Sequence, residues 1–472
     1  MTKKVTKPAA SERVATLLRK QIAGGAYRVG EKLPSIRALA TEMSVSKNCV
    51  VEAFELLAAS GEVEPQRGSG HYVSAPRAPA RTEQEPHTYA KLLDTVWLMR
   101  EQLNNDPKHL PVGHGIPPGH WLSSNGLERA HKRLAKSSFD SMFQYGNRYG
   151  YRPLRELLER RLSTLGIEAR VNQIVLTFGA NEALDVVIRG LMRSGDVALV
   201  DEPGYYPLYG KLKLHGVNIV GVRRNPDGPD VAELERLLKT TGAKLFFTQS
   251  LGQNPTGSDT SPAIAFRMLQ LAEKHDITLV ESDPLADLKP VSMTRAATLD
   301  QLKRTVYIGS FTKSVAASMR VGFIAASVDI AERLADVKML VHVSTSEYTE
   351  KLVEAVLRAP EYPRQIADLR DQAEQATRQA TQILSNLGAE LFCSPPHSLY
   401  LWARLPWAPD SLLLARSMLK DQIAMAPGAV FAIDSTTASP WSRYNVGYVV
   451  DPRFAKAMER RRSAFESKRG AK

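Results

Sequence analysis

The chain has 472 residues, which is too long for one compact domain and suggests two or three. Its apolar content of 43% and charged content of 24% are ordinary for soluble proteins, and the long uncharged apolar stretch at 423–433 is far too short to span a membrane. A formal net charge of +12 favours polyanionic partners.

The first residues and the number of cysteines narrow the class of protein further. Positive charge at the N-terminus is not followed by an apolar segment, so we predict no signal peptide and a cytoplasmic protein. Cys49 and Cys393 are the two cysteines, which leaves neither a disulfide framework nor a cysteine-based zinc site. We therefore predict no metal site.

Residues 1–75 are predicted to form a first domain of the α+β type. Apolar residues at helical spacing indicate two helices, a tight turn precedes a third helix that Ser46 can cap, and two short strands flank a glycine loop. The predicted elements cover residues 14–22, 34–43, 46–60, 63–65 and 71–73.

Two helices joined by a short turn, with a basic hairpin behind them, are typical of a winged helix-turn-helix domain. A helix fits the major groove of DNA, and its outward N-terminal residues, here Lys47 and Asn48, can reach base edges. Residues at the start of the preceding helix and on the hairpin are placed for phosphates. The predicted DNA-binding residues are Arg37, Ser46, Lys47, Asn48, Arg67 and His71. The alternative is a small helical domain with ordinary surface charge.

Three stretches closely resemble the GntR family of bacterial winged-helix repressors and activators: GEKLPSIRALA at 30–40, VSKN at 45–48 and RGSGHYV at 67–73. The resemblance implies binding to a double-stranded DNA operator. Ile36 and Cys49 depart from the family pattern, in which a small polar residue and a threonine are usual. Cys49 is either a redox switch or a small residue packed beneath the reading helix, and we favour packing.

Residues 76–110 are predicted to be a linker. Its first part, rich in Pro, Ala, Arg and Glu, is expected to be mobile, and its second part, 89–103, can form an amphipathic helix. From 111 to 472, short β-rich runs alternate with helical stretches, which predicts an α/β domain with a largely parallel sheet. The clearest β-rich runs are 175–177, 197–200, 245–248 and 278–280.

The strongest chemical signal is the stretch that carries Ser310, Thr312 and Lys313, followed by Arg320. A lysine that bonds an aldehyde needs that aldehyde held beside it, and hydroxyls with an arginine can grip its phosphate. The alternative for this short motif alone is a solvated Lys313. A predicted helix start offers backbone N–H groups for the same phosphate at Gly179, Ala180 and Asn181.

Other polar residues follow predicted strands and complete the pattern. Asn254 offers an amide to a pyridine hydroxyl, Tyr205 can lie against the ring, and Arg443 supplies a bidentate fork for a carboxylate. In this order and spacing, residues 111–451 resemble a fold-type I aminotransferase. The resemblance implies that Lys313 carries pyridoxal 5′-phosphate (PLP), and that Tyr145 reaches the phosphate of the partner subunit in a homodimer.

A GntR-type DNA-binding domain fused to such a domain resembles the MocR subfamily of transcription regulators. The resemblance implies that the protein senses PLP or the adduct of PLP with an amine or amino acid. One segment departs from the aminotransferase pattern, where an aspartate pairs with the pyridine nitrogen and a tyrosine follows. Direct alignment places Ser282 there, whereas a shift of one residue places Asp283, and the tyrosine is absent under either alignment. His397 and Ser398 replace paired glycines and leave the shape of the ligand pocket open.

Two functions follow. The first is a homodimeric, DNA-binding regulator that senses PLP or a PLP–amine adduct, with weak or vestigial transaminase chemistry. The second is a working PLP-dependent aminotransferase with an accessory DNA-binding domain. A third possibility, a scaffold without cofactor, conflicts with the complete set of predicted PLP-binding residues. The altered segment at Ser282 and Asp283 favours the regulator.

Overall fold

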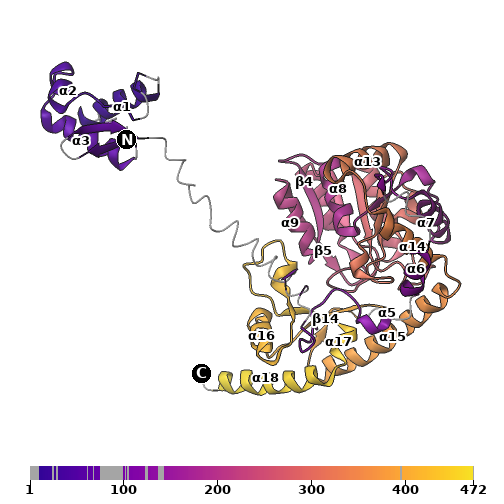
Figure 1. The fold of residues 1–472 in the computed structure, drawn as a ribbon. Helices are drawn as coiled ribbons and strands as arrows, with labels where there is room; N and C mark the ends of the chain where they lie inside the picture. The colour runs from indigo at the N-terminus through magenta and orange to yellow at the C-terminus, as the bar shows by residue number, and fades with distance from the viewer. Residues whose placement is uncertain are drawn as a thin grey trace. The chain divides into compact units, whose positions relative to one another are not determined.

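The computed structural model of the chain divides into two compact units, Met1–Tyr89 and Ala90–Lys472, each described here by itself (Figure 1). It describes residues 10–23, 26–27, 30–60, 62–66, 69–74, 99–100, 103, 106–122, 126–136, 143–393 and 396–470. Most of the predicted linker, including most of the helix expected at 89–103, lies outside these residues.

The first unit is a three-helix domain with a two-stranded antiparallel wing, as predicted. Its elements are α1 (Ala10–Ala23), α2 (Ile36–Glu42), α3 (Lys47–Ala59), β1 (Val63–Gln66) and β2 (Gly70–Val73). The side chains of Ser35 and Ser46 accept hydrogen bonds from backbone N–H groups in the first turns of α2 and α3, which fixes where both helices begin. Leu18 and Phe54 pack in its buried core, and Cys49 lies partly buried against that core.

The second unit contains a sheet of eight strands in the order β3-β10-β9-β8-β7-β4-β5-β6. All pairings from β9 through β5 are parallel, whereas β10 is antiparallel to both neighbours and β6 is antiparallel to β5, so the predicted, largely parallel sheet is confirmed. The strands are β3 (Ile174–Thr177), β4 (Val197–Glu202), β5 (Asn218–Asn225), β6 (Gly228–Pro229), β7 (Leu245–Thr248), β8 (Thr278–Asp283), β9 (Thr305–Ser310) and β10 (Gly322–Ala325).

Helices cover both faces of this sheet. On one face Val200 and Val280 pack in a cluster with residues of α8, α9 and α13, and on the other Leu199 and Leu279 pack with residues of α10 and α11. Neighbouring residues of a strand therefore point to opposite faces, as the pleat requires. The helices are α7 (Arg152–Thr164), α8 (Ala180–Leu191), α9 (Tyr206–Leu214), α10 (Val231–Thr241), α11 (Pro262–Lys274), α12 (Ala296–Asp300), α13 (Val328–His342) and α14 (Glu347–Leu357).

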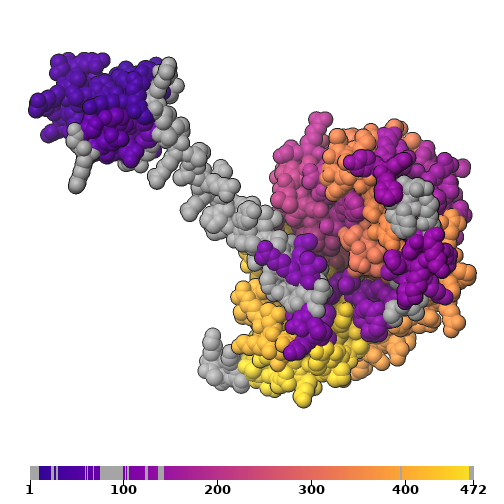
Figure 2. Space-filling view, viewed as in Figure 1, coloured from indigo at the N-terminus to yellow at the C-terminus, as the bar shows by residue number. Residues whose placement is uncertain are grey.

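A smaller antiparallel sheet, in the order β11-β12-β14-β13, forms part of the C-terminal region of this unit. The last residues of that region, in yellow, gather along the lower edge of the unit in Figure 2. The strands of the smaller sheet are β11 (Glu390–Leu391), β12 (Tyr400–Arg404), β13 (Ala426–Pro427) and β14 (Trp441–Asn445). The remaining helices are α5 (Gly119–Leu122), α6 (Leu127–Leu134), α15 (Tyr362–Asn386), α16 (Ser411–Met418), α17 (Val446–Val449) and α18 (Pro452–Gly470). Short 3-10 helices cover Val171–Gln173, Ala317–Met319, Leu419–Asp421 and Gly428–Phe431.

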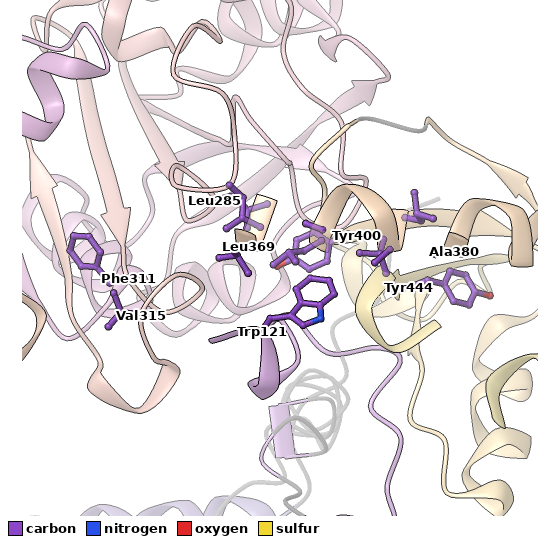
Figure 3. Close-up of a cluster of buried hydrophobic side chains, with 14 of the residues drawn as sticks. Trp121, Leu285, Phe311, Val315, Leu369, Ala380, Tyr400 and Tyr444 are labelled. Atoms are coloured by element: carbon purple, nitrogen blue, oxygen red, sulfur yellow. The ribbon is translucent and has the colours of Figure 1, made fainter. Parts of the chain in front are cut away.

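The largest apolar cluster joins the large sheet to this C-terminal part. It includes Trp121, Phe311, Tyr400 and Tyr444, whose side chains are drawn in Figure 3. Among the helices that the structure describes, none combines the length and the apolar character that crossing a membrane requires.

Candidate cofactor and DNA-binding sites

The predicted phosphate-binding residues meet where β3, β9 and β10 lie side by side. Ser310 on β9 is paired with Gly322 on β10, and its hydroxyl lies 2.9 Å from that of Thr312. Gly179 caps α8, and Arg320 donates a hydrogen bond from Nη2 to the carbonyl of Phe178 at 3.0 Å. A Cβ atom on Gly179 would lie 2.8 Å from Arg320 Nη2, and the φ of 80° at Gly179 is one that residues with side chains rarely adopt, so glycine suits this position beside the helix start.

Lys313, the predicted PLP-bonding residue, lies close to a residue that sequence reasoning missed. Its Nζ donates a hydrogen bond to the carbonyl of Gly115 at 2.5 Å and contacts the hydroxyl of Tyr400. The Tyr400 hydroxyl donates to the same carbonyl at 2.8 Å. Tyr400 begins β12 two residues after Ser398. Its position next to His397 and Ser398, which depart from the aminotransferase pattern, was the sequence signal that could have identified it.

Arg443 and Asn254, predicted from segments far apart in the sequence, are brought together. Arg443 on β14 is buried and donates from Nη1 to Asn254 Oδ1 at 2.7 Å and from Nη2 to the Gly113 carbonyl at 2.6 Å. Its guanidinium group lies 5.1 Å from the centre of the Tyr400 ring, and its Nε is buried with no partner. The guanidinium group is therefore held at the site by both Nη atoms, while Nε has no hydrogen-bond partner.

Tyr205 and Ser282 line the same small cavity of about 20 Å³, as does Asp201. Burial raises the pKa of Tyr205 to about 12, with Tyr400 adding to the rise and Arg443 opposing it, so the hydroxyl stays protonated. Ser282 lies on the sheet face of Val280, next to α8 and α9. It therefore shares a face with the residue predicted to lie against the PLP ring.

Asp283 points to the face of the sheet opposite to Ser282. Its Oδ2 accepts hydrogen bonds from Arg295 Nε at 2.6 Å and from the Tyr307 hydroxyl at 2.9 Å, and all three side chains are buried. A second carboxylate, Asp201, was not predicted. It is buried in contact with Arg224 and Thr248, and burial raises its pKa.

The two departures before β12 have a structural role. Ser398 is buried, accepts a hydrogen bond from the backbone N–H of Tyr400 and donates to the Tyr400 carbonyl at 2.8 Å, while His397 adopts a positive φ of 52°. Together they fix the start of β12 and with it the Tyr400 ring. Tyr145, expected to serve a partner subunit, is 83% exposed.

The residues present fit PLP. The glycine-lined space beside α8 and Arg320 suits a phosphate, Asn254 and Tyr205 suit the ring, and the lysine amine lies beside the arginine fork. The phosphate, the ring and the aldehyde of the cofactor thus each have a matching group.

On the first unit, Arg37, Lys47 and Asn48 are exposed, whereas Ser46 is engaged as the cap of α3. His71 has an unexpected contact: its ring stacks on Phe54 of α3 at a centroid distance of 4.1 Å, and burial lowers its pKa. This packing holds the wing, β1 and β2, against α3, the helix predicted to enter the major groove. Arg67 lies outside the described residues.

Comparisons with known proteins agree with both units. Residues 110–454 match the family described as aminotransferase class I and II, and residues 10–73 match the bacterial regulatory proteins of the gntR family. The chain is 26% identical to the uncharacterized HTH-type transcriptional regulator YdcR of Escherichia coli (strain K12), over 92% of this chain and 93% of that protein. It is 25% identical to the HTH-type transcriptional regulator NorG of Staphylococcus aureus (strain USA300), over 85% and 92%.

Among solved structures, the second unit resembles LysN, the α-aminoadipate aminotransferase of Thermus thermophilus, with a TM-score of 0.70 and 21% identity over 77% of this chain and 94% of that one. It also resembles the kynurenine aminotransferase of Pyrococcus horikoshii, with a TM-score of 0.72 and 21% identity over 79% and 94%. These likenesses confirm the predicted fold-type I architecture.

Proposed function

The chain belongs to the aminotransferase class I and II family and carries a gntR-family DNA-binding domain, and from this premise we propose that it is a transcription regulator that senses PLP or a PLP–amine adduct. The observation that carries the proposal is the fusion itself, a winged-helix unit with exposed Lys47 and Asn48 in one chain with the Lys313 site. This is the MocR-type organisation that the sequence predicted. The similarity to proteins named HTH-type transcriptional regulators along most of their length supports it.

In this proposal the second unit holds PLP through its own side chains. Arg320, Ser310 and the backbone N–H groups at the start of α8 bind the phosphate, Asn254 donates to the phenolic oxygen, and Tyr205 lies against the ring. When bound, PLP supplies an aldehyde for an amine and an electron-withdrawing ring. Arg443 then offers its fork to the carboxylate of an amino acid.

Ser282 is the reason to favour sensing over turnover. A carboxylate beside the pyridine nitrogen keeps it protonated and makes the ring a strong electron sink, and a serine hydroxyl does this poorly. Because Asp283 is committed to Arg295 and Tyr307 on the opposite face, it does not replace the missing carboxylate. A site with weak chemistry retains its ligand, which suits a sensor.

We infer that the regulator is a homodimer. Near the predicted partner-binding Tyr145, Phe143 is 85% exposed, and Leu340 at the end of α13 is also 85% exposed. Exposed apolar side chains support a subunit interface where they form a contiguous patch. Two reading helices in one dimer would bind two half-sites of an operator.

A working aminotransferase is the second candidate. The complete set of Lys313, Arg320, Asn254 and Arg443 favours it, because each of these groups is also needed for amino-group transfer. In that case the DNA-binding unit would be accessory.

Genome-wide binding-site mapping tests the regulatory function most directly. We expect discrete sites for the wild-type chain and their loss in a Lys47→Ala/Asn48→Ala double variant, because these side chains are assigned to base edges. A Lys239→Ala/Lys274→Ala double variant on the second unit is the control and should keep every site. Binding without sequence preference in the wild type would reject the function.

A further inference from the structure

The residues Val112–Ile116, which we call the crossing segment, run through the cofactor site directly after the predicted linker. The backbone of Gly113 donates to the Ala424 carbonyl at 2.8 Å, and the backbone of Asn445 donates to the Val112 carbonyl at 2.7 Å. The segment is thereby held between β14 and the stretch that leads into β13. It is the part of the second unit that continues, through residues 106–111, toward the DNA-binding unit.

Backbone carbonyls of the crossing segment accept hydrogen bonds from protein side chains at the predicted ligand-binding site. Gly113 accepts from Arg443 Nη2 at 2.6 Å, and Gly115 accepts from Tyr400 at 2.8 Å and from Lys313 at 2.5 Å. The two carbonyls between and after them, those of His114 and Ile116, accept from Asn445 Nδ2 at 3.0 and 2.7 Å.

Close packing keeps the crossing segment against the site. A Cβ atom on Gly113 would lie 2.4 Å from the backbone nitrogen of Ala426, so the chain can pass there only as glycine. A Cβ atom on Gly115 would lie 3.7 Å from both Arg443 Nη atoms and 3.8 Å from the Tyr400 oxygen, which is ordinary contact. A change in the position of Arg443 or Tyr400 would therefore directly change the contacts of the crossing segment.

We propose that Tyr400 and the crossing segment transmit ligand binding at Lys313 and Arg443 to the linker, with Tyr400 as a positioning residue. This inference rests on the proposed function. A carboxylate that binds an arginine fork in either bidentate arrangement uses Nη2, the nitrogen that donates to Gly113. An amino acid at Arg443 thus takes or shares a donor of the segment.

Tyr400 joins the two ends of the ligand site to the same segment. Its ring centre lies 5.1 Å from the Arg443 guanidinium carbon and 5.2 Å from Lys313 Nζ, while its hydroxyl bonds to Gly115. A ligand between Lys313 and Arg443 lies against this ring. Movement of the ring would change the hydrogen bond between the Tyr400 hydroxyl and the Gly115 carbonyl. The contacts from Arg443 and from Lys313 therefore reach the same five backbone residues, the crossing segment.

The test uses the full chain and a stable probe, N-(5′-phosphopyridoxyl)-L-alanine, which joins the cofactor to an amino acid without further chemistry. Two quantities are measured with and without the probe: deuterium uptake of residues 110–118 and operator affinity. In the wild type we expect uptake to change at least about threefold and operator affinity to change about fivefold or more, the low end of common coupling between sites.

Tyr400→Phe removes the hydroxyl and keeps the ring. We expect the probe still to bind this variant, but deuterium uptake and operator affinity to be nearly the same with the probe as without it. Tyr444→Phe is the matched control, since Tyr444 lies on the adjacent strand with its ring pointing elsewhere in the same cluster (Figure 3), and it should behave as wild type. Gly119→Ala, whose added methyl group meets nothing within 4 Å, is a second control and should also behave as wild type.

If the probe changed deuterium uptake and operator affinity in Tyr400→Phe as much as in the wild type, the inference would be overturned. A wild-type chain whose operator affinity ignores the probe would reject the proposed function instead. In that case a probe-dependent change in uptake at 110–118 that requires Tyr400 would still support the link within the second unit, and an unchanged uptake would reject it as well.

Discussion

The assignment of Ser282 to the ring side and Asp283 to the protein interior predicts what Asp283→Asn does. In the wild type Asp283 and Arg295 form an ion pair at 2.6 Å with side chains 2% and 0% exposed, and Tyr307 donates to the same carboxylate oxygen. The substitution keeps the size of the side chain but leaves the Arg295 guanidinium buried without its anion.

Breaking a buried pair by removing one partner costs about 3–5 kcal/mol. We expect a loss near 3 kcal/mol, because Glu281 lies close enough to act on Arg295 and partly compensates. For a domain of about 360 residues (111–472), the entropy of unfolding is roughly 0.75 kcal/mol per kelvin, so the midpoint should fall by about 4 °C.

Thermal unfolding of the PLP-free chain, followed by circular dichroism, measures this shift, and a titration with PLP gives the affinity for the cofactor. Asp283→Asn should lower the midpoint and leave the visible band of lysine-linked PLP in place. The control, Ser282→Ala, should leave the midpoint within about 1 °C, as expected for a small change beside a cavity. An Asp283→Asn chain of wild-type stability that binds PLP poorly would refute the assignment.

Four further outcomes follow. Lys313→Ala should abolish the visible band after incubation with PLP, and a band of wild-type intensity would contradict the assignment. Arg443→Lys should weaken binding of N-(5′-phosphopyridoxyl)-L-alanine about tenfold or more, by loss of the bidentate fork, without affecting the PLP band. Arg37→Ala should flatten the salt dependence of operator binding by about one unit, whereas Lys47→Ala should alter the preferred sequence in a binding selection. Because burial lowers the pKa of His71 in the folded state, the unfolded state binds more protons as pH falls below 6.5, so the isolated winged-helix unit (1–75) should lose stability there; His71→Phe should remove this dependence in denaturant titrations.

Local sequence patterns predicted most of the fold. Helical spacing located α2, helical spacing together with the cap at Ser46 located α3, and β-rich runs located β3, β4, β7 and β8. The antiparallel strand β10 could not be predicted, because pairing direction depends on partners distant in the chain.

The candidate site was predicted where motifs are contiguous and missed where the contacts are long-range. Lys313 and Arg320 were evident from their spacing, whereas the contact of Lys313 with Gly115 joins residues 198 positions apart. Strand alternation showed that Ser282 and Asp283 must face opposite ways, but only the position of Arg295 and Tyr307 shows which way. The stacking of His71 on Phe54 likewise depends on how the wing packs against α3.

The most direct test of a ligand-sensing regulator measures operator affinity with no ligand, with PLP, and with PLP plus an amino acid, while the visible spectrum follows conversion to the pyridoxamine form in the same sample. The account predicts that operator affinity shifts about fivefold or more with ligand and that conversion is slow. Operator affinity indifferent to both ligands, together with conversion at enzyme-like rates, would contradict it and establish the aminotransferase instead.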